Sequence, residues 1–100
     1  MSEKLAASLG AWDRSLRLAK MARVTTFSPT QIANRISDIA IFTEITPGEM
    51  PLPIYALCVD ARERRERGVD KPFAINTIIL AVTDALRTLE TTRVLTRVAE

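Results

Sequence analysis

Residues 72–89, PFAINTIILAVTDALRTL, form the longest apolar passage of the chain and decide its fold class. Five apolar residues of this passage recur at steps of four, three, four and three: Ile75, Ile79, Val82, Leu86 and Leu89. Because an α-helix turns once in about 3.6 residues, this spacing places all five on one side of a helix. The passage therefore predicts a helix that lies either at the centre of the domain or between two subunits.

Two other interpretations of this passage are less consistent with its sequence. Its β-branched residues are typical of a strand, but the helical spacing continues well beyond a strand of about 5–6 residues. Asp70 and Pro72 also resemble a helix start, with a capping acid and a proline in the first turn. A membrane-spanning helix needs about 20 apolar residues, whereas Asn76, Asp84 and Arg87 interrupt this one.

The N-terminal region predicts another long helix, over about Glu3–Arg23. The same four–three spacing gives it an apolar stripe of Leu5, Leu9, Trp12, Leu16 and Ala19. Ser2 is suited to the N-cap position, and the carboxylate of Glu3 favours the positive end of the helix dipole.

Two shorter helices are predicted between these long ones. Ser28-Pro29-Thr30-Gln31 matches a capping box with proline at the first helical position, so a helix should run to about Glu44 or Ile45. The proline-rich segment of residues 46–53 breaks that helix. A third helix is expected over about Pro53–Arg67, with Gly68 as its stop.

The 100 residues should therefore form a single all-α domain, a small bundle of about four helices, with the long C-terminal helix central or at a dimer interface. Hydrophobic residues make up 47% of the chain and charged residues 26%, which is enough apolar material for a core. If the last helix continues to Arg97 it would be about 37 Å long. A compact domain of this size is only about 33 Å across, so the end of the helix should fray, bend near Thr91-Thr92 or lie against a second subunit. The two long helices with surplus apolar faces favour a homodimer.

A surplus of apolar residues predicts a surface that binds protein, either a partner or a second copy. The residues assigned to it are Ile41, Phe42, Ile45, Ile75, Ile79, Val82, Leu86 and Leu89. Leu18 and Met21 also project away from the stripe of the first helix. For each of these residues taken singly, packing inside the core of a homodimer is at least as good an interpretation as binding a different protein.

Two groups of basic residues are candidates for contacts with phosphate or with an acidic partner: Arg14, Arg17, Lys20, Arg23, Arg62 and Arg65. The simpler interpretation is that the first four stabilise a helix C-terminus and the others lie on a solvated face. The net charge of +2 is too small to predict a nucleic-acid-binding domain by itself.

The composition argues against catalysis. The chain has no histidine, which removes the commonest acid–base group and the commonest metal ligand. Cys58 is the only cysteine and lies on an apolar helix face, so a buried structural thiol is expected. We therefore expect neither enzyme activity nor a cofactor or metal. A single cysteine and an N-terminus without a secretory pattern fit a cytoplasmic protein.

Gln31-Ile32-Ala33 with Ile36, followed by Gly48-Glu49 and Pro51, resembles the helix-turn-helix of phage-repressor-type DNA-binding domains. That resemblance implies a turn near Ser37-Asp38, where the sequence has no turn signal. The implied recognition segment, Asp38–Ile45, contains two acids and no base, whereas major-groove readers use Arg, Lys, Asn or Gln. One continuous helix explains the same residues more simply.

These observations predict a non-enzymatic regulatory protein that binds another protein through an apolar helix face. An anti-activator that blocks a transcription regulator is one example. The alternative is a DNA-binding transcriptional regulator that contacts phosphates through its basic clusters.

Overall fold

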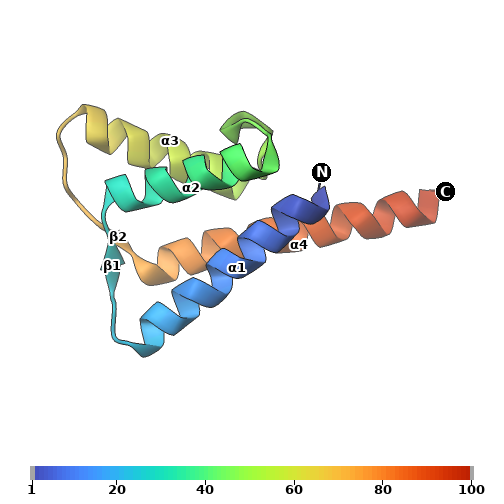
Figure 1. Cartoon of the computed structure of the whole chain (residues 1–100), viewed down its shortest axis with the longest axis horizontal. Helices are drawn as coiled ribbons and strands as arrows, with labels where there is room; N and C mark the ends of the chain where they lie inside the picture. The colour runs from blue at the N-terminus through green and yellow to red at the C-terminus, as the bar shows by residue number, and fades with distance from the viewer. Residues whose placement is uncertain (1, 100) are drawn as a thin grey trace.

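The described part of the chain, residues 2–99, contains four helices, one short 3-10 helix and two very short strands (Figure 1). The computed structural model describes the backbone of residues 2–99 and the side chains of residues 3–91. The elements in chain order are α1 (Ser2–Met21), β1 (Thr26–Phe27), α2 (Pro29–Thr43), η1 (Pro47–Glu49), α3 (Leu52–Glu66), β2 (Phe73–Ala74) and α4 (Ile75–Ala99). This confirms the predicted all-α bundle of four helices.

The helices form two antiparallel pairs, α1 with α4 and α2 with α3, which pack on each other (Figure 1). The strands pair antiparallel at one end, with Thr26 opposite Ala74 and Phe27 opposite Phe73. The amide of Ile75 extends this pairing by donating to the carbonyl of Thr25 over 2.9 Å. Because β1 joins α1 to α2 and β2 joins α3 to α4, the ribbon ties the two halves of the chain together.

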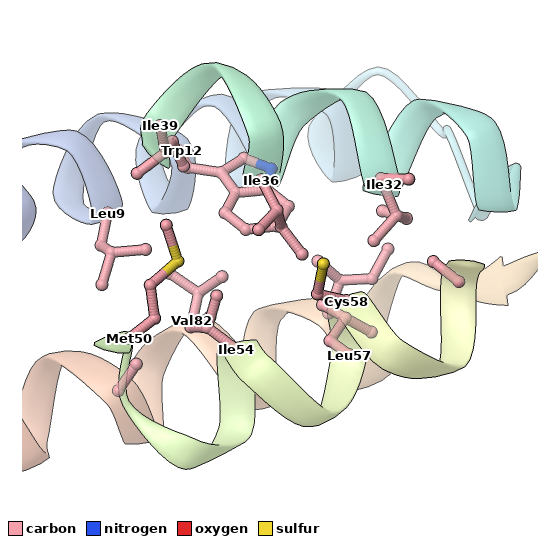
Figure 2. Close-up of a cluster of buried hydrophobic side chains, with 14 of the residues drawn as sticks. Leu9, Trp12, Ile32, Ile36, Ile39, Met50, Ile54, Leu57, Cys58 and Val82 are labelled. Carbon is pink, nitrogen blue, oxygen red and sulfur yellow. The ribbon is translucent and has the colours of Figure 1, made fainter. Parts of the chain in front are cut away.

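Side chains from all four helices fill one interior (Figure 2). Leu9, Ile36, Ile54, Ile78 and Val82 are each 0% exposed. Ile78 and Val82 belong to α4, which packs against both α1 and α3. The last helix, which was predicted to lie at the centre of the domain or at a dimer interface, thus contributes to the core of its own chain.

The predicted start of α4 at Asp70 and Pro72 is wrong. Residues 73 and 74 are extended and form β2, and the helix begins only at Ile75. The reason is tertiary: the backbone of Phe73 and Ala74 pairs with β1, while the Phe73 ring is buried. These contacts hold the two residues outside the helix that their sequence would otherwise join.

The first three helices end in the same way, with one residue in the left-handed conformation: Arg23 (φ 67°), Glu44 (φ 59°) and Gly68 (φ 67°). The amide of the residue after it donates to a carbonyl five positions earlier: Val24 to Ala19 (3.0 Å), Ile45 to Ala40 (3.1 Å) and Val69 to Arg64 (2.8 Å). This is the Schellman motif, in which glycine is the usual left-handed residue. The stop at Gly68 was predictable; the ends of α1 and α2 fall slightly earlier than predicted because arginine and glutamate give no such signal.

The predicted capping box of α2 is confirmed. The Ser28 hydroxyl accepts from the Gln31 amide over 3.1 Å, and the Ser28 amide donates to the Gln31 side chain over 2.8 Å. Helix α1 begins at Ser2. The N-cap role that the sequence predicted for the Ser2 side chain lies outside the described side chains.

The last helix continues far beyond Leu89. Its 25 residues correspond to a length of about 37 Å, in a chain with a longest axis of 48 Å. Its C-terminal part extends beyond the other helices (Figure 1). We call residues 92–99 the α4 overhang.

Candidate interaction surfaces

Large apolar side chains are exposed where α2 ends and α3 begins. Ile41 is 76% exposed, Phe42 64% and Leu52 74%, and Tyr55 is 41% exposed one turn after Leu52. The 3-10 helix η1 connects the two helices at this end of the molecule (Figure 1). We call Ile41, Phe42, Leu52 and Tyr55 the end patch.

A cation borders the end patch. The Lys4 ammonium lies 5.8 Å from the centre of the Phe42 ring, which brings the start of α1 beside the end of α2. At this distance the cation still interacts with the ring face.

Several residues assigned to a protein-binding surface instead fill the core of the chain. Ile45 is 7% exposed, Ile75 5% and Val82 0%, which corrects the expectation that they face a partner. Ile45 turns inward because it follows the left-handed residue Glu44 and leaves the helical line of Ile41.

The other α4 residues assigned to that surface, Ile79, Leu86 and Leu89, are partly buried and pack against the same core. The stripe of α4 is used inside the bundle because α4 contacts both α1 and α3. Within the described side chains, Leu80 is the large apolar residue that α4 leaves exposed, at 63%.

The basic residues of α1 do not act as one cluster of free charges. Arg17 pairs with Asp13 over 3.0 Å, and the Lys20 ammonium donates to the Asn76 amide oxygen over 2.8 Å. Arg14 and Arg23 are exposed and have no ion pair among the described residues.

Arg62 and Arg65 lie on the exposed side of α3, where they line a shallow depression together with Glu66. The ends of α1 and α3 lie on either side of the β ribbon, away from the connection between α2 and α3 (Figure 1). Arg23 follows the end of α1, Arg62 and Arg65 lie in the last turns of α3, and Arg14 lies nearer the middle of α1. The structure thus separates Arg23, Arg62 and Arg65 from the end patch, which Lys4 borders.

Helix α2 is continuous from Pro29 to Thr43 and has no turn at Ser37-Asp38. The helix that follows it, α3, packs antiparallel to it (Figure 1). The described residues around α2 therefore lack the helix-turn-helix geometry that the resemblance implied.

Sequence reasoning missed a groove between α3 and α4. Its lining residues are Pro53, Ala56, Leu57, Asp60, Arg64, Pro72, Phe73, Ala74, Thr77, Ala81 and Asp84. The buried side chains of Leu57 and Phe73 form its floor, and Asp60, Arg64 and Asp84 are its charged groups. The remaining lining residues are small or are prolines, which leaves room between the two helices. We call this the α3/α4 groove.

Arg64 closes the groove at the ribbon end. Its guanidinium donates to both carboxylate oxygens of Asp60 over 3.0 and 3.2 Å and to the Lys71 carbonyl over 2.9 Å. Asp84 is held only loosely, by Arg87 at 3.8 Å, and its side chain is 57% exposed. The residues that line the groove include two carboxylates and one guanidinium, so the lining itself carries a small negative charge, and Arg87 outside the lining offsets part of it. The helical spacing of Thr77, Ala81 and Asp84 places these three residues on one face of α4, and this could be read from the sequence. That this face lines a groove depends on where α3 packs, which the sequence did not indicate.

Cys58 is free and 1% exposed, as predicted for a structural thiol. Among the described residues, no group of three or more His, Cys, Asp or Glu side chains is placed to hold a metal ion. Within the same residues, none of the helices combines the length and hydrophobicity that crossing a bilayer requires.

Comparison with protein-family models, with curated proteins and with solved structures finds no match for this chain. Its function must therefore be argued from its own surfaces.

Proposed function

We propose that the chain is a non-enzymatic regulatory protein that binds another protein through the end patch. The observation that carries the proposal is the exposure of Ile41, Phe42 and Leu52 on either side of the connection between α2 and α3. Other large apolar side chains are exposed elsewhere, among them Leu18, Met21 and Leu80. Burying such a side chain in an interface contributes about 1.5–3 kcal/mol. Exposed apolar side chains that form a contiguous patch are typical of protein-binding sites.

An anti-activator that covers a surface of a transcription regulator is a concrete form of this function. The apolar residues of α2 would occupy a groove on the regulator, in the way amphipathic helices dock. Lys4, beside Phe42, would contact an acidic residue of that regulator. Such a protein would work in the cytoplasm.

A capture experiment with matched variants tests this function. Tagged protein is incubated with host lysate, and the bound proteins are identified by mass spectrometry. We expect Phe42→Asp to lose the specific partner. Leu18→Asp should retain it, because Leu18 is equally exposed (66% against 64%) but lies on α1, outside the end patch. Equal capture by both variants would contradict the proposal.

Phosphate binding is the second candidate function. It is favoured by the exposure of Arg23, Arg62 and Arg65 at the ribbon end of the molecule and of Arg14 on α1. Each phosphate contact makes the affinity for duplex DNA fall with salt. Fluorescence anisotropy with duplex DNA at two salt concentrations tests it. Salt-sensitive binding that is lost in Arg62→Ala/Arg65→Ala would establish this function in place of the first.

Self-association also forms part of the proposed function. The overhang of α4 supports it, because the backbone of this helix extends beyond the other helices of its own bundle (Figure 1). The end patch remains available to a different protein if the two copies meet elsewhere.

A further inference from the structure

We propose that the α3/α4 groove of one copy receives the α4 overhang of a second copy, and that the second copy receives the first in the same way. This inference rests on the self-association proposed above and assigns it a surface. It is independent of the end patch.

The groove and the overhang lie along one side of the same helix. Thr77, Ala81 and Asp84 line the groove, and steps of four, three, four and three continue this line through positions 88, 91, 95 and 98. Side chains beyond Thr91 lie outside those described. Positions 95 and 98 are leucine and valine.

The sizes of the two parts agree. The overhang of residues 92–99 is about 12 Å long, and the α3 wall of the groove, from Pro53 to Arg64, is about 16 Å long. The small residues on the groove walls allow a second helix to approach closely. Leu57 and Phe73 supply an apolar floor for leucine and valine.

Their charges are complementary as well. The groove carries Asp60, which pairs with Arg64 over 3.0 Å, and Asp84, whose pair with Arg87 is longer at 3.8 Å. The overhang contains Arg93 and Arg97 and no acidic residue. An acidic groove and a basic helix end attract each other and fix their relative direction.

A two-fold axis near Thr88 satisfies both contacts at once. Leu95 lies as far after Thr88 as Ala81 lies before it, so two antiparallel α4 helices that cross there place Leu95 of each copy beside Ala81 of the other. The same register brings Arg93 within one turn of Asp84. Such an isologous interface closes on itself, as most homodimers do.

The test is the mass of the full chain in solution, measured by sedimentation equilibrium over a range of concentrations. We expect the mass to rise toward twice the monomer value of 11.1 kDa. Asp84→Arg and Arg93→Asp should each weaken the dimer by about tenfold or more, because each creates two like-charge contacts. Glu63→Arg, which changes an exposed acid outside the groove, should have no effect.

Mixing the two single variants gives the sharpest result. In a heterodimer of Asp84→Arg with Arg93→Asp, both contacts again join opposite charges, so the mixture should dimerise more tightly than either variant does alone. Circular dichroism of each variant checks that it remains helical. A monomer at every concentration, or a dimer indifferent to both substitutions, would overturn the proposal. Neither outcome would affect the capture of a partner through Phe42, so the experiment can contradict the dimer proposal without contradicting the proposed function.

Discussion

The guanidinium of Arg64 lies 3.8 Å from the centre of the Phe73 ring. Arg64 is near the end of α3 and Phe73 is in β2, so this contact fixes the chain between α3 and α4. The same guanidinium holds Asp60 and the Lys71 carbonyl. One side chain thereby positions β2, delays the start of α4 and closes the α3/α4 groove.

Phe73→Ala should destabilise the protein by about 3–5 kcal/mol, because it removes a buried ring from the core. Arg64→Met keeps the apolar stem but loses the ring contact and the hydrogen bonds; we expect a loss of about 1 kcal/mol for this partly exposed group. Urea unfolding followed by circular dichroism measures both changes. Arg62→Met is the matched control and should stay within about 0.5 kcal/mol of the parent.

Introducing glycine at a left-handed helix end and removing it from one should have opposite effects on stability. Glu44→Gly and Arg23→Gly should each stabilise the protein by about 0.5 kcal/mol, since relief of backbone strain exceeds the entropy that glycine costs. Gly68→Ala should destabilise it by about 1 kcal/mol. No atom lies within 4 Å of the added methyl group, so this loss would come from the backbone alone. Thermal unfolding of the three variants compares them; a stabilising Gly68→Ala would contradict the assignment.

Two isoleucines four residues apart should respond very differently to truncation. Ile45→Ala should cost about 2–5 kcal/mol because Ile45 is 7% exposed, whereas Ile41→Ala should change stability by no more than about 0.5 kcal/mol at 76% exposure. Chemical denaturation of both variants provides the measurement. Equal losses would mean that Ile41 packs against its own chain and is not free for a partner.

The thiol of Cys58 should be protected from reagents in the folded protein. At 1% exposure it reacts only when the bundle opens, so labelling by a disulfide reagent should be on the order of 10³-fold slower or more than in urea. Thr30→Cys in a Cys58→Ala background is the control, because position 30 is exposed and should react at once. Rapid labelling of the native parent protein would show that the core around α3 opens easily.

Local patterns in the sequence determined the helices and their inward faces. The spacing of Leu5, Leu9, Trp12 and Leu16 and the capping box of Ser28 and Gln31 involve neighbours within a few residues, and both are confirmed. Such features depend on helix geometry and on hydrogen bonds within one turn, which the sequence contains directly.

The surfaces were decided by tertiary packing. Helical spacing showed that Ile75 and Val82 share a face, but it could not distinguish a neighbour in the same chain from a second subunit. The position of Phe73 likewise depends on Arg64 and on Thr26–Phe27, which are distant along the chain. The apolar stripe of a helix indicates only that this side of the helix must be buried. Which element buries it, and which faces of the helix remain exposed, depends on how all four helices pack together.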